Sequence, residues 1–140
     1  MTIYNRQTEK PGSRITRRAS GAITVNRFVK VDGSQATVLG ERVIGVSYDG
    51  AQDAELIGVT IDGTALVEVG AYGIGKGMLV MTDVNGKAVK ATKGKMAAGV
   101  ALQDALSGQL LEIMIGTEEK VSATFTTTTT TTTATTTTAP

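Results

Sequence analysis

The sequence predicts an all-β protein, a small β-barrel or sandwich built from two related β units, with an extended N-terminal arm and a Thr-rich C-terminal tail. Short aliphatic and β-branched runs recur about every ten residues, separated by Gly and Asp turn signals, a pattern typical of sandwiches and barrels. A pair of such runs also occurs twice, at residues 42–47 with 55–61 and at residues 96–102 with 110–115. Two units are too few for a solenoid, so we expect them to pack face to face as one domain.

The composition excludes several classes of partner. A chain of 140 residues is one domain plus its tails. Its net charge of +1 gives no overall field, so we expect neither a nucleic-acid nor a membrane partner. Aromatic residues make up only 4% of the chain, so Val, Ile, Leu, Ala and Met must form the core. A small domain with such a core gains stability from partner subunits, which favours a homo-oligomer.

The chain contains no histidine and no cysteine. This excludes disulfides, thiolate chemistry, histidine acid–base catalysis and the usual zinc sites, and we expect no cofactor. The first residues lack the apolar segment of a signal peptide, and no apolar run is long enough to cross a bilayer. We therefore expect a soluble protein made in the cytoplasm.

Residues 1–20 are predicted to form a flexible basic arm, because they carry little apolar content and Pro11 and Gly12 interrupt any regular element. One interpretation is an unstructured, solubilising terminus, and the other is an arm that becomes ordered on a partner. A nucleic-acid arm is disfavoured because no aromatic residues alternate with the basic ones after Tyr4. The basic residues are Arg6, Lys10, Arg14, Arg17 and Arg18.

Residues 21–116 are predicted to form the β domain. Residues 23–31 indicate a strand that ends at a turn at Asp32 and Gly33, and residues 65–69 indicate another. The pair Asn85 and Gly86 favours a type I′ hairpin between residues 78–81 and 87–90. Glycines within predicted strands indicate a bulge or a close approach of two backbones, and they stand at Gly45, Gly58 and Gly99.

Residues 117–140 are predicted to form a separate tail, which is almost pure threonine after Phe125. One interpretation is a disordered or polyproline-like tail that could carry O-glycans. The other is an extended strand that pairs with a neighbouring copy through its backbone. For the second interpretation, the candidate inter-subunit residues are Phe125, Thr126, Thr130 and Thr135.

No constellation of residues predicts catalysis. Residues 70–77 match G-x-x-x-x-G-K, but Gly77 stands where a phosphate-binding loop needs Ser or Thr, and a predicted strand follows where that loop needs a helix. The serines have no histidine partner, and most acidic residues occur at predicted turns. We therefore expect that the protein is not an enzyme.

Gly- and Val-containing motifs recur over about residues 21–116, and they lie at residues 21–33, 43–46, 77–81, 85–87, 98–101 and 108–115. In these motifs the chain resembles the capsid cement, or head decoration, proteins of tailed bacteriophages. The resemblance implies a small β domain on the outside of an icosahedral shell that bridges neighbouring major capsid subunits. It also implies a trimer with an N-terminal arm reaching onto the shell, whereas the threonine tail departs from the family pattern.

From the residues and the resemblance together, we predict a structural virion protein on the outer surface of the capsid, with the major capsid protein as its partner. The five basic residues of the arm are the candidate docking residues, acting through extended backbone pairing and salt-sensitive charge contacts. The alternative is a self-assembling tube or fibre subunit linked through its Thr-rich tail.

Overall fold

The computed structural model describes residues 12–115, and in that range the protein consists of strands, turns and loops without a helix. The strands are β1 (Arg14–Arg18), β2 (Phe28–Val29), β3 (Gly45–Ser47), β4 (Leu56–Thr60), β5 (Gly63–Glu68), β6 (Leu79–Thr82), β7 (Ala88–Lys90), β8 (Gly99–Ala101) and β9 (Leu110–Ile115). The all-β prediction is confirmed.

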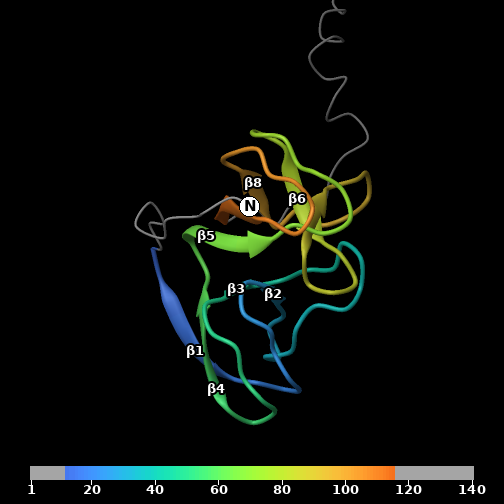
Figure 1. The fold of residues 1–140 in the computed structure, drawn as a ribbon. Helices are drawn as coiled ribbons and strands as arrows, with labels where there is room; N and C mark the ends of the chain where they lie inside the picture. The colour runs from blue at the N-terminus through green and yellow to red at the C-terminus, as the bar shows by residue number, and fades with distance from the viewer. Residues whose placement is uncertain (1–11, 116–140) are drawn as a thin grey trace, which may run out of the picture.

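The strands form two antiparallel sheets, one for each predicted β unit. The first sheet has the order β1-β4-β3-β2 and the second β5-β9-β8-β6-β7. In Figure 1 the first sheet occupies the lower part of the view and the second the upper part. The order of the first sheet matches that of the first four strands of the second, so the duplication seen in the sequence is a duplication of topology.

The correspondence extends to the loops. Ile23 and Ala51 exchange two backbone hydrogen bonds of 2.8 and 2.9 Å in the first unit. Ile74 and Ala105 do the same in the second unit, at 2.8 and 3.0 Å. The same long-range contact therefore fastens the loop before the second strand of each unit to the loop before its last strand.

The two antiparallel sheets pack around two apolar clusters, which agrees with the small barrel or sandwich of two related β units expected from the sequence. In the second unit, the Gly70 N–H donates to the Ala88 carbonyl at 2.8 Å and brings the end of β5 to β7. The smaller cluster belongs to the first unit and comprises Ala19, Ile23, Val29, Ile57 and Val59. The larger cluster joins first-unit side chains, among them Phe28 and Val46, to second-unit side chains such as Leu111 and Ile113.

The flexible arm predicted for residues 1–20 needs a correction at its C-terminal end. Residues Arg14–Arg18 form β1 and pair with β4 over five positions, from Arg14 opposite Thr60 to Arg18 opposite Leu56. Only Ile15 of this strand packs against the small cluster. An edge strand is held by backbone pairing on one side and needs few apolar residues, so its pattern resembled that of a flexible segment. Residues 1–11 lie outside the described range.

The hairpin predicted at residues 78–90 is confirmed as β6 and β7, but its turn differs. The Asp83 carboxylate accepts hydrogen bonds from the N–H groups of Asn85 and Lys87, at 2.7 and 2.9 Å. Gly86 has a φ of 75°, whereas Asn85 is not among the residues with positive φ. A type I′ turn requires positive φ at both central residues, so the observed turn is a longer one with glycine alone in the left-handed conformation.

Two of the three strand glycines stand where two backbones approach closely. A Cβ built on Gly45 would overlap the Thr60 carbonyl oxygen, and one built on Gly99 would overlap the Met114 carbonyl oxygen. Gly58 is different, because a Cβ there would make only ordinary contacts, with the Asp49 carboxylate at 3.5 Å and with the Tyr48 Cβ at 3.9 Å. The prediction therefore holds for Gly45 and Gly99 and fails for Gly58.

Candidate functional site

Strand β1 is the edge of the first sheet and presents an unpaired backbone. The Ile61 N–H donates to the Ser13 carbonyl at 2.9 Å, so the odd-numbered residues of this segment face β4. In an antiparallel pair the residues between them direct their N–H and C=O groups the other way. Arg14 and Thr16 therefore present backbone donors and acceptors at an edge beside which no other strand lies within residues 12–115.

The arginines of β1 are exposed but differ in their contacts. The Arg14 guanidinium lies 3.7 Å from the centre of the Tyr48 ring, and its Nε donates to Thr60 Oγ1 at 3.2 Å. Arg18 donates to the Ala54 carbonyl at 2.7 Å. Arg17 is exposed on the opposite face of the strand, across from Ile57. Two of the three arginines are thus oriented by the sheet itself.

The structure brings together only part of the predicted docking set. Arg14, Arg17 and Arg18 share β1, whereas Arg6 and Lys10 lie outside the described residues. The candidate tail residues Phe125, Thr126, Thr130 and Thr135 also lie outside them. The sequence did not reveal that β1 is a strand edge, and the only signal available was the single apolar residue Ile15 between polar neighbours.

A charged cluster joins the two units. Arg27 of the first unit lies 2.9 Å from Glu68 on β5 and donates to the Asn85 carbonyl at 3.0 Å, while Lys87 lies 3.4 Å from Glu68. Burial raises the pKa of Glu68, but the hydrogen bonds and charges of Arg27 and Lys87 outweigh it and hold that pKa below its ordinary value. Glu68 pairs with Arg27 across the units and with Lys87 within the second unit, so the cluster is a structural contact between the units.

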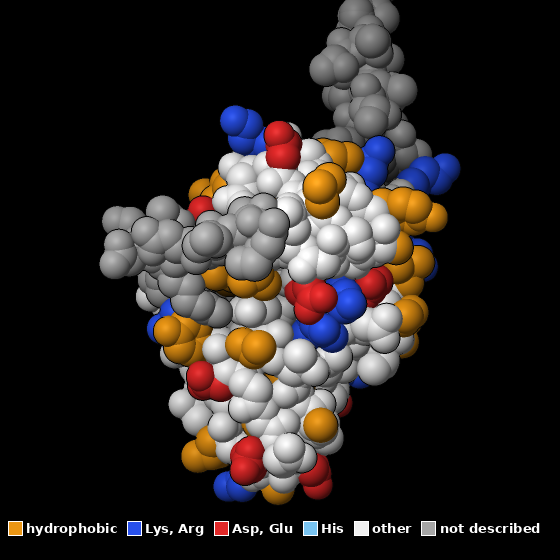
Figure 2. All heavy atoms as spheres, viewed as in Figure 1, with side chains coloured by type: hydrophobic (Ala, Val, Ile, Leu, Met, Phe, Trp, Pro, Cys, Tyr) orange, Lys and Arg blue, Asp and Glu red, His pale blue; other side chains and the backbone are white. Residues whose placement is uncertain are grey.

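The face shown in Figure 2 has no dominant sign of charge. On the face shown in Figure 2, acidic and basic side chains are interspersed, and several of both signs lie together near the middle of the view. Such a surface gives no long-range attraction to a polyanion. Charges on this face would therefore act through local contacts.

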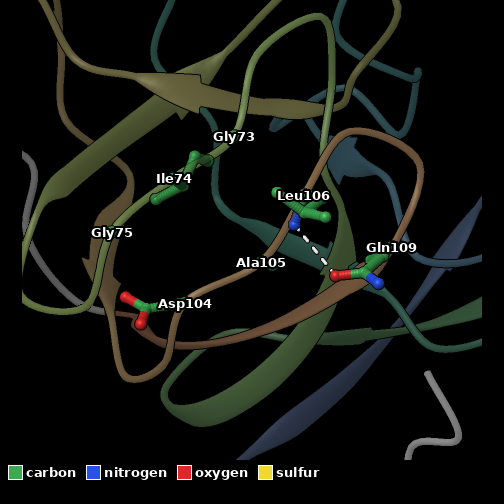
Figure 3. Close-up of a pocket in the computed structure, with 7 residues that line it drawn as sticks. All are labelled: Gly73, Ile74, Gly75, Asp104, Ala105, Leu106 and Gln109. Atoms are coloured by element: carbon green, nitrogen blue, oxygen red, sulfur yellow. Dashed lines mark hydrogen bonds between the residues drawn. The ribbon is translucent and has the colours of Figure 1, made fainter.

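A shallow, open hollow of about 310 Å³ lies between two loops of the second unit (Figure 3). Its polar groups already serve the loops, because Asp104 accepts from the Lys76 N–H at 2.8 Å and Gln109 accepts from the Leu106 N–H at 2.9 Å. The rest of the lining is apolar or glycine. The hollow thus holds no group that is poised for chemistry.

The loop that matches G-x-x-x-x-G-K lies beside this hollow and leads into β6, not into a helix. The helix N-terminus that would receive phosphates is therefore missing from this loop. Across residues 12–115, no three acidic side chains gather as metal ligands would. The same range holds no helix of the length and apolar character needed to span a membrane.

A family model described as phage cement protein matches residues 7–116. This chain belongs to the phage cement protein family. No curated protein sequence matches it. Among solved structures, the chain is similar to the N base of head fiber gp8.5 from bacteriophage phi29, with 19% identity and a TM-score of 0.61, covering 77% of this chain and 98% of that one.

As a member of this family, the protein is a structural component of the phage virion associated with the capsid. The family supports the resemblance drawn from the sequence and does not favour the alternative of a tube or fibre subunit. Because the sequence identity is low, the likeness to the phi29 head fiber base is a likeness of fold alone.

Proposed function

We propose that this cement protein binds the outer surface of the capsid and holds neighbouring major capsid subunits together, with β1 as its docking strand. The observation that carries this proposal is the exposed edge of β1, where Arg14 and Thr16 offer unpaired backbone groups beside exposed arginine side chains. An extended capsid segment would add to such an edge as a further strand. The predicted residues Arg6 and Lys10 would extend the same contact.

The charges would set the register of docking. Arg14 and Arg18 are held in place by Tyr48, Thr60 and the Ala54 carbonyl, so little of their side-chain freedom remains to be lost on binding. Contacts between exposed charges weaken as salt screens them. Binding should therefore weaken at high ionic strength without disappearing, because the backbone pairing remains.

The rest of the proposal follows the same logic. The protein acts as a homo-oligomer, with a trimer favoured, because symmetry repeats many weak contacts. It is not an enzyme and needs neither nucleic acid nor membrane, and it is made in the host cytoplasm before it joins the virion. Phe125, Thr126, Thr130 and Thr135 would link subunits, which predicts that removing residues 117–140 loosens the decorated shell while each protein still binds.

The test is decoration of capsids that lack this protein, measured by cosedimentation. Deleting residues 1–18 would also remove β1 from the sheet, so single substitutions are the sharper probe. Arg17→Glu reverses an exposed charge on β1, and Lys93→Glu makes the same change at an exposed turn of the second unit. We expect the first variant to weaken capsid binding by about tenfold or more, as loss of a charge contact can, and the second to bind as wild type.

A second variant tests the backbone contact. Thr16→Pro removes an N–H that faces the free edge, so the pairing of β1 with β4 survives while an added strand loses a donor and meets the ring. We expect a folded protein with impaired decoration. If Arg17→Glu and Thr16→Pro both decorate capsids as wild type does, β1 is not the docking strand.

A further inference from the structure

The repeat makes it possible to compare one row of side chains across both sheets. In the first sheet the register places Arg14, Thr60, Val46 and Phe28 opposite one another across β1, β4, β3 and β2. In the second sheet it places Thr64, Met114, Val100 and Leu79 opposite one another across β5, β9, β8 and β6. Residues directly opposite each other lie on one face of a sheet, so the two rows are equivalent.

The two rows differ in what covers them. Thr60, Val46 and Phe28 are each only 1% exposed, and Val46 and Phe28 pack in the cluster that they share with the second unit. Met114 occupies the position of Thr60 and is 52% exposed, while Val100 and Leu79 are half-buried. None of these three belongs to either apolar cluster of the described residues. The row that the first unit buries against its neighbour is thus open in the second.

The open row belongs to a larger apolar face. Met81 and Val89 lie opposite each other on β6 and β7, and Met81 shares the face of Leu79 because alternate residues of a strand point the same way. An antiparallel sheet with one solvated face normally carries polar residues there. The charged side chains on this face are Glu112 of β9, opposite Leu66, and Glu68 of β5, opposite Leu110. Met81 is only 2% exposed, so the part of this face that is open to solvent is the row of Met114, Val100 and Leu79. An apolar row left open on a sheet face indicates an interaction surface.

We propose that this open row, formed by Met114, Val100 and Leu79, binds a second copy of this chain. The chain itself indicates the occupant, because the equivalent row of the first unit is buried against a β unit of the same kind. In repeat architectures an end that is not capped by polar residues is open to a further unit. The inference rests on the proposed function, since it names the surface of the expected homo-oligomer.

The full-length protein with Met114→Asp tests this inference by sedimentation across a range of concentrations. Met114 is exposed in the free chain, so the fold tolerates the change, whereas an interface would bury an unpaired carboxylate. We expect the concentration of half-assembly to rise by about tenfold or more. Leu56→Asp is the matched control, because Leu56 is also an apolar strand residue, 61% exposed, but lies on β4. This control should assemble as wild type.

A second measurement avoids the introduced charge and its effect on folding. The chain has no cysteine, so the reactivity of a single introduced thiol can be followed. Met114→Cys and Leu56→Cys each introduce a single thiol on a side chain of moderate size. Thiol reactivity depends on access, so assembly should slow the modification of the thiol from Met114→Cys by about tenfold or more and leave that from Leu56→Cys unchanged.

Three results would overturn the inference. They are a wild-type chain that stays monomeric at every concentration, a Met114→Asp variant that assembles like wild type, and equal reactivity of the two thiols in the assembled protein. The second and third of these results leave the proposed function intact as long as the wild type decorates capsids, whereas the first would also remove the homo-oligomer from it. Failure of the wild type to bind capsids would instead overturn the proposed function.

Discussion

Phe28 in the first β unit and Leu79 in the second hold equivalent places in their sheets, but Phe28 is 1% exposed and Leu79 is half-buried. The backbone plan around them is the same, down to Gly45 and Gly99, which lie opposite the next residues along each strand, Val29 and Val80. The difference lies in their surroundings, because the second unit covers Phe28 and the described part of the chain offers no equivalent cover for Leu79. The two units therefore share the features that their backbones require and differ in what covers the outer face of each sheet.

The cores differ in the same sense. The first unit fills its own small cluster with isoleucines, including Ile23 and Ile57, and Ile15 packs against it. The second unit's cluster is completed by Phe28 and Val46 from the first. Side chains of the first unit thus form part of the second unit's core, and the two units are expected to unfold together.

The largest expected effect comes from truncating this shared side chain. Phe28→Ala removes a fully buried ring from the joint cluster and should lower the free energy of unfolding by about 3–5 kcal/mol. Leu79→Ala at the equivalent place should cost only about 1 kcal/mol, because part of that side chain already meets water. Urea denaturation of both variants as dilute monomers measures the difference. Equal losses would mean that the second sheet's outer face is covered as completely as the first.

A smaller effect tests the feature that the units share. Gly45→Ala and Gly99→Ala would each push a Cβ into a carbonyl oxygen of the next strand, so the backbone must shift, and each should cost about 2–3 kcal/mol. Gly58→Ala is the control within a strand, because a Cβ fits there, and it should be neutral or slightly stabilising. Thermal unfolding of the three variants decides the matter. A harmless Gly45→Ala would show that the close approach is not a constraint of the repeat.

The contact between the units is expected to depend on pH through Glu68. Its pKa is held below the ordinary value near 4.5, so its stabilising contribution is present above that value and is lost as the pH falls through the lowered pKa. Glu68→Gln should cost about 1–2 kcal/mol at neutral pH, since it replaces charged hydrogen bonds by neutral ones. The difference in the free energy of unfolding between wild type and variant should disappear in acid, as measured by urea denaturation at each pH.

Asp32 provides the control for this titration. Hydrogen bonds from the Ser34 hydroxyl and N–H lower the pKa of Asp32, so it also destabilises the fold in acid, but it lies in a turn away from the contact between the units. When Asp32→Asn is introduced into both wild type and Glu68→Gln, the difference in their free energies of unfolding should therefore stay unchanged at each pH. A gap that persists in acid would show that Glu68 does not act through its charge.

The sequence predicted those parts of the fold that are encoded locally. The duplicated runs became β3 with β4 and β8 with β9, and the glycine and valine spacing placed Gly45 and Gly99 correctly. The predicted strand at residues 23–31 was reduced to Phe28–Val29, because Asn26 adopts a φ of 63° and interrupts it. Strand length there depends on a turn that no hydrophobic pattern reveals.

The candidate surfaces were harder to predict, because they depend on register. Nothing in the segment Arg14–Arg18 indicates a strand until β4 is known to lie beside it. Met114 likewise reads as an ordinary apolar strand residue, and its exposure emerges only when Val100 and Thr64 are placed opposite it. Local patterns predict which residues form strands, whereas the partners across a sheet decide which face is left open.

The smallest expected effect is a change in stability that has opposite signs at equivalent turns of the two units. Ala54 and Gly108 precede the last strand of each unit and have φ values of 73° and 84°, and their N–H groups donate to the carbonyls of Ala19 and Val69. An alanine in this left-handed conformation is strained by about 1–2 kcal/mol, and glycine is not. Ala54→Gly should stabilise the protein by about 0.5–1 kcal/mol after the greater entropy of the unfolded glycine is subtracted. Gly108→Ala should destabilise it by a similar amount, since no atom blocks the added Cβ. Urea denaturation of the two variants side by side checks this prediction, and effects of the same sign would show that the two turns are not equivalent.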